Sequence, residues 1–418
     1  MVHQMMNTKI PNAASASNTK IHMTTTAHKV QRLLSLSALL LLASCATPPT
    51  PEPLGSIPQT PPPATAAWTD LLAWDATQPL PAAVQRPAAQ WQPVRWADVP
   101  GVSDDPLAAL LPAWLRSCER PAKALAPWCA RLRTLTLEGP EASLNWLVSE
   151  WQPYRIQSLN NDSEGLLTGY FEPMLYASRE RDATHTVPLH ATPRGWKRGQ
   201  TWYTRQQADQ DPTAMAALAG RELLWVSDPI EALIVQIQGS GRVLVREPDG
   251  QERTVRLAFA GHNGQTYQSV ARWLMNQGEI RSATWPVIKA WAAQNPSRIQ
   301  AMLWANPRLV FFKEEALNGL DSQAGPRGAQ GVPLTPQRSI AVDRRSIPYG
   351  TPVWMSTQGA TLNTQRWVMA QDTGGAILGA VRADYFTGWG DEARDTASTL
   401  KQPLQLWTLW PRGLTPPN

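Results

Sequence analysis

The chain has 418 residues, which is enough for two or three domains and a sizeable core. Hydrophobic residues make up 43% and charged residues 17%, so the composition is globular and not disordered. The net charge of +5 is dilute and no Lys/Arg run stands out, which argues against a nucleic-acid-binding protein and leaves a polyanionic or wall-associated partner open. Each of the 20 Trp residues is more simply a core residue than a platform for a sugar ring.

Residues 1–45 have the pattern of a secretory presequence. A basic stretch at 29–32 precedes the apolar run 33–42, which is too short to span a bilayer. The ending Leu-Ala-Ser-Cys45 resembles a bacterial lipobox, so we expect Cys45 to carry a lipid after cleavage. Ala46 follows in place of an Asp, which predicts anchoring in the outer membrane, facing the periplasm. Met23 would give a signal of ordinary length and is a candidate true start.

A proline-rich tether at 46–67 follows, with eight prolines between 47 and 65. Such a segment is extended and packs no core. The mature chain then retains only Cys118 and Cys129. A disulfide between them is plausible in an oxidising periplasm, whereas two thiols are too few for a thiolate zinc site.

The body changes from a helical to a β-rich pattern near residue 160. Ser103 to Pro106 predicts the capped start of a helix that carries Leu107, Leu110 and Trp114, and a second helical repeat runs from Leu144 to Trp151. Helical patterns return at 270–277 and 287–304. Short strands are predicted at 223–226, 232–238, 242–246, 254–260, 309–312, 339–342, 352–355, 366–370 and 404–409.

Three aspartates end or follow apolar strand-like runs in the C-terminal region: Asp343, Asp372 and Asp384. Acids at strand ends of one small barrel can converge on one cleft, and Arg382 would share the face of Asp384. Two close carboxyl groups in a desolvated groove push one pKa up, which keeps a general acid protonated near neutral pH. The alternative is that each Asp only caps a turn.

Two further segments carry polar groups among apolar ones. In the segment 168–173, Tyr170 and Glu172 put an acid beside aromatic rings. In the segment 236–242, we expect Gln236 and Gln238 on one face of a strand, with Ser240 and Arg242 after it, a set suited to sugar hydroxyl and N-acetyl groups. A phosphate loop is a weaker interpretation because no Lys follows at the required spacing. The scattered His residues predict neither a zinc helix nor a Ser-His-Asp hydrolase.

These motifs, taken in order over residues 160–411, resemble the membrane-bound lytic murein transglycosylase A family. The likeness is carried by the segments 168–173, 236–242, 306–312, 331–343, 371–377 and 382–384. The last two resemble the family's C-terminal module, which is named for its three Asp. Phe171 and Thr387 depart from the family pattern, which favours a Tyr and an aromatic residue at those positions.

The resemblance implies a mainly β fold with helices (α+β), in which a double-psi β-barrel domain is interrupted by a second small β-rich domain. It places the barrel at 68–167 and 306–418 and the insert at 168–305, with a glycan-binding groove between them. It makes Asp384 the acid and base, with Asp372 beside it and Asp343 in support. Tyr170, Glu172, Gln236, Gln238, Ser240, Arg242, Thr373 and Gly374 would bind the substrate.

The implied reaction cleaves the β-1,4 bond between N-acetylmuramic acid and N-acetylglucosamine in peptidoglycan. A single Asp suffices if the C6 hydroxyl of the muramic acid closes a 1,6-anhydro ring, whereas a hydrolase needs two carboxylates. No metal or organic cofactor is expected. Two other classes remain open: a conventional glycoside hydrolase using Asp384 with Asp372 or Glu172, and a wall-binding lipoprotein without activity.

Overall fold

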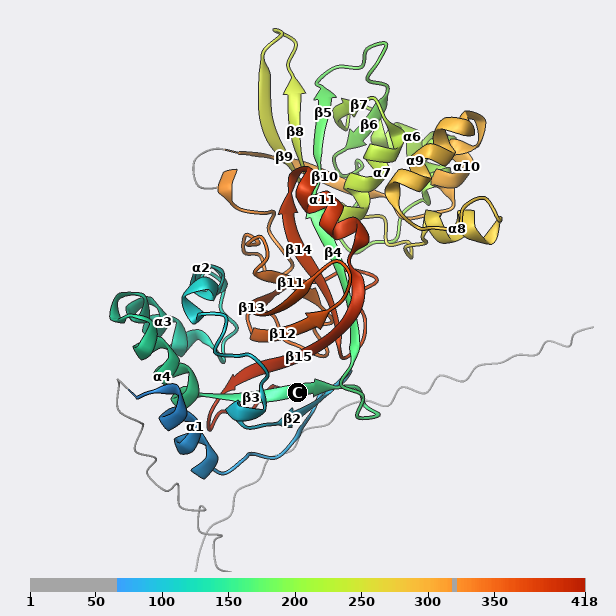
Figure 1. The fold of residues 1–418 in the computed structure, drawn as a ribbon. Helices are drawn as coiled ribbons and strands as arrows, with labels where there is room; N and C mark the ends of the chain where they lie inside the picture. The colour runs from blue at the N-terminus through green and yellow to red at the C-terminus, as the bar shows by residue number, and fades with distance from the viewer. Residues whose placement is uncertain (1–65, 318–321, 418) are drawn as a thin grey trace, which may run out of the picture. The chain divides into compact units, whose positions relative to one another are not determined.

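A ring of six paired strands forms the centre of the structure, a computed structural model that describes residues 66–317 and 322–417. The order is β15-β12-β13-β11-β14-β4, and a further pairing of β4 with β15 closes the ring (Figure 1). Two of its pairs are parallel, β11 with β13 and β14 with β4. The six strands are β4 (Gly165–Glu172), β11 (Ser339–Val342), β12 (Pro352–Gln358), β13 (Asn363–Asp372), β14 (Arg382–Trp389) and β15 (Lys401–Pro411).

Three more strands extend this sheet to nine. The far end of β15 pairs with β3 (Trp151–Gln157), which pairs with β2 (Gln90–Pro93), and β1 (Val84–Gln85) forms the edge. β11 is buried along its whole length because it lies between β13 and β14 inside the ring. Strands buried on both faces read as continuous apolar runs, which is how the sequence predicts 339–342 correctly.

A second sheet of six strands has the order β10-β9-β8-β5-β7-β6. Only Pro173 separates β4, in the nine-stranded sheet, from β5 in the six-stranded sheet. The strands of the second sheet are β5 (Met174–Ser178), β6 (Val187–His190), β7 (Glu222–Val226), β8 (Gly241–Arg246), β9 (Glu252–His262) and β10 (Val310–Ala316). The division into a barrel and an insert at 168–305 stays a prediction.

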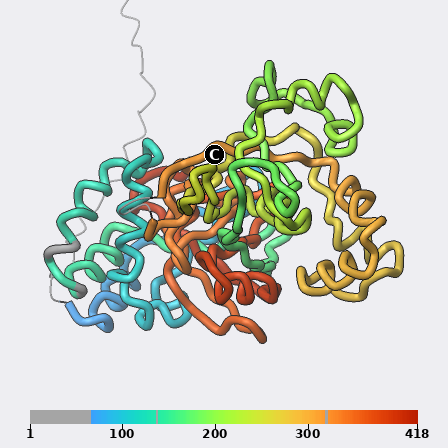
Figure 2. Tube along the Cα trace, turned by 90° about the horizontal axis from the view of Figure 1, so that it is seen from above, coloured from blue at the N-terminus to red at the C-terminus, as the bar shows by residue number. Residues whose placement is uncertain are grey.

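Two groups of helices lie apart from each other in both views, one beside the ring and one beside the second sheet (Figures 1 and 2). The N-terminal group, blue to teal, holds α1 (Trp68–Thr77), α2 (Leu107–Ser117), α3 (Ala126–Glu138) and α4 (Pro140–Glu150). The green to orange group holds α5 (Arg205–Gln210), α6 (Pro212–Leu218), α7 (Pro229–Gln238), α8 (Val270–Asn276), α9 (Trp285–Gln294) and α10 (Ile299–Trp304). α11 (Gly390–Thr399) packs on β4 and β14.

Tryptophan fills the core between the N-terminal helices and the barrel. Trp114 of α2 meets Trp151 edge-on with ring centroids 5.1 Å apart, and Trp354 meets Trp367 at 4.9 Å. Such pairs add to the large apolar area that each ring buries. The interpretation of Trp as a core residue holds for these four side chains, all of which are buried. Beside them, Cys118 and Cys129 form a disulfide.

The predicted strand at 232–238 is wrong, because this segment belongs to helix α7. Asp228 caps the helix by accepting a hydrogen bond from the Ile230 amide at 2.7 Å, Pro229 occupies the first turn, and Gly239 ends it in a left-handed conformation. The apolar residues of α7 pack into two core clusters, so the helix shows no polar face that would reveal its period.

The predicted cap at 103–106 is also wrong, although the helix itself begins at Leu107 as expected. Pro106 is the residue before the helix, and no side chain caps it. Asp105 instead accepts a hydrogen bond from the Trp367 amide at 2.8 Å and forms an ion pair with Arg338. The fixed cation of Arg338 therefore holds this carboxylate against the barrel and away from the helix terminus.

The predicted lipid site at Cys45 and the tether at 46–67 fall wholly or almost wholly outside the described residues. In the described part of the chain, every helix is too short or too polar to cross a membrane.

Candidate active site

The closed ring brings Asp372 and Asp384 into one row of side chains. Ala341 of β11 is in register with Asp384 of β14 on one side and with Asp372 of β13 on the other. Asp384 is in turn paired with Thr168 of β4. Neighbouring strands lie about 4.8 Å apart and residues in register share a face, so the two acids stand two strands apart on one face.

Asp384 has one oxygen held and one available. Its Oδ1 accepts a hydrogen bond from the hydroxyl of Thr168, whereas Oδ2 has no hydrogen-bond partner among the described residues. Burial raises the pKa of Asp384 above its ordinary value, and the Thr168 hydrogen bond and the charge of Arg382 act in the opposite direction. Asp384 is the third residue of β14 and not the end of a strand as predicted, because β14 continues to Trp389 in its pairing with β4.

Asp372 ends β13, and both of its oxygens are engaged. Oδ1 accepts a hydrogen bond from the Ala329 amide at 2.8 Å, and Oδ2 accepts one from the Tyr170 hydroxyl at 3.0 Å. Burial raises the pKa of Asp372 to about 6, and the nearby charge of Asp384 adds to the effect. Burial is therefore the main cause for both acids, while the effect of like charge falls on Asp372.

Asp343 differs from this pair because its pKa is lowered and not raised. Its carboxylate is almost fully buried and accepts hydrogen bonds from the Arg345 guanidinium at 2.8 Å and from the Gly379 amide at 3.0 Å. Burial acts to raise the pKa of Asp343, but these hydrogen bonds outweigh it and lower the pKa. Such a carboxylate is ionised and fixes the loops after β11 and before β14.

Tyr170 and Thr373 flank the two acids. The Tyr170 ring packs on Phe386 with centroids 5.3 Å apart, and burial raises its pKa well above the ordinary value, so its hydroxyl stays a donor. Thr373 follows Asp372 directly, is exposed, and donates its hydroxyl to the Val342 carbonyl at 2.9 Å. Gly374 comes next and is half-buried.

Glu172 and Arg242, both predicted to bind substrate, are bonded to each other. Arg242 donates to Oε2 of Glu172 at 2.8 Å, and Arg256 donates to Oε1 at 2.6 Å. Glu172 is 1% exposed, and the guanidinium of Arg242 also lies 3.7 Å from the ring centroid of Trp389. Because Glu172 ends β4 while both arginines lie in the second sheet, this network joins the two sheets.

The two glutamines lie on a helix, so they do not share the strand face that the sequence predicts. Gln236 accepts a hydrogen bond from Arg205 at 2.8 Å, and Gln238 accepts one from the Phe171 amide at 3.2 Å. Residues two apart on a helix point about 200° apart, which explains the two different partners. Ser240 follows the helix and is buried.

Sequence reasoning finds Arg382 beside Asp384 but misses Thr168 and Ala329, which hold the acids. Arg382 donates to the Thr168 hydroxyl at 2.8 Å, which leaves the Thr168 hydrogen for Asp384. The position of Arg382 two residues before Asp384 was a usable signal, whereas the pairing of β14 with β4 brings in Thr168 from 216 positions away. Ala329 donates through its backbone, so its residue type carries no signal at all.

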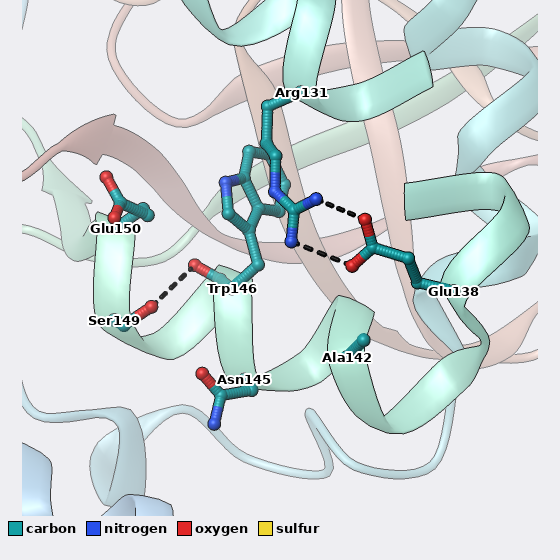
Figure 3. A pocket seen from close by; sticks show the side chains of 7 residues that line it. All are labelled: Arg131, Glu138, Ala142, Asn145, Trp146, Ser149 and Glu150. Atoms are coloured by element: carbon teal, nitrogen blue, oxygen red, sulfur yellow. Dashed lines mark hydrogen bonds and ion pairs between the residues drawn. The ribbon is translucent and has the colours of Figure 1, made fainter. Parts of the chain in front are cut away.

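The described residues contain no cluster of three or more His, Cys, Asp and Glu side chains that could hold a metal ion. A separate pocket lies between α3 and α4, away from the acids (Figure 3). At its rim Arg131 and Glu138 form an exposed ion pair, and Ser149 donates to the Trp146 carbonyl within its own helix at 3.4 Å.

Fold and site together define a two-sheet protein whose barrel carries a pair of half-buried carboxyl groups with raised pKa values, an arrangement suited to proton transfer. The profile of the MltA specific insert domain matches residues 166–313, and that of the 3D domain matches residues 338–410. The chain belongs to the MltA family, whose named members are lytic transglycosylases and hence enzymes. The resemblance stated from the motifs is therefore confirmed.

Relatives of known structure share this fold. A lytic transglycosylase of Burkholderia pseudomallei, LtgG, is 41% identical, with 80% of this chain and 100% of that chain covered and a TM-score of 0.53. MltA from Neisseria gonorrhoeae is 27% identical, with coverage of 81% and 97% and a TM-score of 0.66. The membrane-bound lytic murein transglycosylase A of Vibrio cholerae is 30% identical over 260 residues, 59% of this chain and 66% of the relative, just under two thirds.

Proposed function

We propose that this protein is a lytic murein transglycosylase that cleaves the β-1,4 bond between N-acetylmuramic acid and N-acetylglucosamine in peptidoglycan. One observation carries the proposal: Asp384 is held through Oδ1 by Thr168, while Oδ2 has no hydrogen-bond partner in the described part of the chain and can serve the substrate. Burial raises the pKa of this carboxyl group, which favours the protonated form that a general acid requires.

In the first step, Asp384 donates its proton to the glycosidic oxygen. The bond from C1 of the muramic acid to this oxygen breaks, the N-acetylglucosamine leaves with a hydroxyl at C4, and positive charge develops at C1. Arg382 and Thr168 fix the carboxyl group during this step, because Arg382 holds the Thr168 oxygen that donates to Oδ1. A general acid works only within hydrogen-bond reach of the atom that it protonates.

In the second step, the Asp384 carboxylate takes the proton of the C6 hydroxyl in the same muramic acid. The C6 oxygen bonds to C1 and closes the 1,6-anhydro ring, which returns Asp384 to its starting state. An attacking group in the same molecule has a high effective concentration, so no carboxylate is needed to activate water.

Asp372 supports the acid as its electrostatic partner. Two half-buried carboxyl groups two strands apart oppose each other's ionisation, so the active form of the pair holds one proton, which lies on Asp384 when it acts as the acid. The pKa of Asp372 is raised to about 6, so the pair changes its number of bound protons at mildly acidic pH. Tyr170 stabilises the charged form of Asp372 through its 3.0 Å hydrogen bond.

We assign substrate contacts by their position beside the two acids. Tyr170, Thr373 and Gly374 border the acids, and we assign them to the sugar that is cleaved. The groups of Glu172, Gln236, Gln238, Ser240 and Arg242 face protein partners or are buried, so their part in binding is to shape the wall of the groove.

The proposal includes the finer fold and the place of the protein in the cell. The six-strand ring, with its parallel pairs β11–β13 and β14–β4, is consistent with a double-psi β-barrel, and the glycan would lie in a groove between this ring and the second sheet. A lipid on Cys45 would anchor the protein to the outer membrane, facing the periplasm, where peptidoglycan is its partner.

The experiment is digestion of purified peptidoglycan with analysis of the soluble fragments by mass spectrometry. We expect muropeptides from the wild type and none from Asp384→Asn, which keeps the size of the side chain but cannot donate an acidic proton. Asp391→Asn is the matched control, because Asp391 lies exposed on α11 beside Arg394, and it should match the wild type. Appreciable turnover by Asp384→Asn would refute the assignment, and glycan binding without cleavage by the wild type would indicate a wall-binding protein.

A further inference from the structure

The C-terminal end of α2 touches both segments that hold Asp372. Ser117, the last residue of α2, accepts a hydrogen bond from Gln371 at 2.8 Å and donates one to Gln330 at 3.1 Å. Gln371 directly precedes Asp372, and Gln330 directly follows Ala329, whose amide donates to Asp372. A single buried hydroxyl thus connects to the carboxyl group along two routes.

The first route runs through β13. Gln371 is fully buried and also donates to the Ala113 carbonyl of α2 at 2.8 Å, while its Oε1 accepts from Ser339 at 2.5 Å. Gln371 therefore ties the end of β13 to α2, while Asp372 is bonded to Tyr170.

The second route runs through the loop that contains Ala329. The side chain of Gln330 donates to the carbonyls of Ser117 and Arg120, each at 3.2 Å, and its own amide donates to the Gln371 carbonyl at 3.0 Å. The carbonyl of Arg120 belongs to the segment closed by the Cys118–Cys129 disulfide. These bonds fix the loop beside the end of β13, so that the Ala329 amide points at Oδ1 of Asp372.

We propose that Ser117 and Gln330 are positioning residues for Asp372, and that the disulfide-closed end of α2 sets the direction of the Ala329 amide. Both residues lie outside the two segments that the family profiles match, 166–313 and 338–410. The residues that position Asp372 therefore come from the N-terminal helices of this chain and from a loop between the matched segments.

If Ser117 and Gln330 position the Ala329 amide, removing either side chain should change the ionisation of Asp372. The groups that act on it are the Thr373 and Ala329 amides, the Tyr170 hydroxyl from β4 and the Asp384 carboxyl from β14, and Tyr349 from the segment before β12 interacts with its charge. The Ala329 hydrogen bond stabilises the charged form and lowers the pKa of Asp372. When this hydrogen bond loses its alignment, burial and the charge of Asp384, which raise the pKa, are offset less. We expect the pKa of Asp372 to rise by about 0.5 to 1 pH unit.

The test uses Ser117→Ala, which removes the shared hydroxyl, and Gln330→Leu, which removes the side-chain bonds but keeps the backbone amide. Ser149→Ala is the matched control, since Ser149 also lies near a helix C-terminus and, among the described residues, its hydroxyl bonds within α4 alone (Figure 3). The readouts are the pH dependence of muropeptide release and a 13C NMR titration of the Asp side-chain carboxyl groups. Asp372→Asn identifies the Asp372 signal by its loss.

The pH profile rests on the proposed function, whereas the NMR titration does not. We expect both test variants to move the titration of Asp372 and the acidic limb of the pH profile upward, with no movement in Ser149→Ala. Folded test variants that titrate like the wild type would overturn the positioning role, whatever their activity. If the wild type releases no fragments while the Asp372 titration still shifts in both test variants, the positioning role is supported and the transglycosylase proposal is refuted.

Discussion

Asp372 is a carboxyl group whose ionisation opposes folding. Its pKa is about 6 in the folded protein against an ordinary value of 3.8, so its contribution to stability is complete below pH 4 and is lost as the pH rises through 6. Asp372→Asn cannot ionise and should be more stable than the wild type by about 1 to 3 kcal/mol at pH 8. At pH 4 the difference should vanish.

Urea denaturation at the two pH values measures this difference. The exposed Asp391→Asn variant serves as the control for the loss of one carboxyl group. Equal destabilisation of Asp372→Asn at both pH values would show that its hydrogen bonds, and not its charge, dominate its role in the fold.

At this scale the sequence predicts the acids better than their partners. Asp372 and Asp384 follow apolar runs that end in one barrel, which is a local pattern. Thr168 reaches Asp384 only through the closure of the ring, and Ala329 acts through a backbone amide. Long-range pairing and backbone donors leave no mark on residue type, so a single sequence cannot show them.

Among the elements, the junction of β4 with the second sheet depends on Glu172. Glu172→Gln would leave Arg242 and Arg256 buried without their counter-charge, and removing one partner of a buried pair typically costs about 3–5 kcal/mol. We expect a loss of this size in urea denaturation. Glu138→Gln breaks the exposed pair with Arg131 and should leave the midpoint unchanged. Similar effects of the two variants would contradict the role of Glu172 as the junction.

The elements themselves divide by the kind of signal they carry. The strands at 339–342 and 242–246 are found where the sequence predicts them, because apolar β-branched runs between turns are diagnostic there. The sequence predicts a strand in place of helix α7 because the helix is buried on nearly all sides and rich in Ile and Val. The Asp228-Pro229 start and the Gly239 stop were the signals that would have identified it.

For the whole molecule, the presequence predicts a lipid-anchored protein. Cys45→Ser should abolish incorporation of labelled palmitate and release the protein from the outer-membrane fraction. Cys118→Ser is the control, because Cys118 is bonded to Cys129 in the body of the protein and should leave labelling intact. Labelling of the Cys45→Ser variant would place the lipid elsewhere.

The central claim is ring closure without water, and digestion in 18O-labelled water tests it most directly. If the C6 hydroxyl is the nucleophile, mass spectrometry will find muropeptides one water lighter than hydrolytic products and free of 18O at the muramic acid. Asp384→Asn should yield neither product. Fragments with a reducing muramic acid that carries 18O would contradict the account and make the protein a hydrolase with a second catalytic carboxylate.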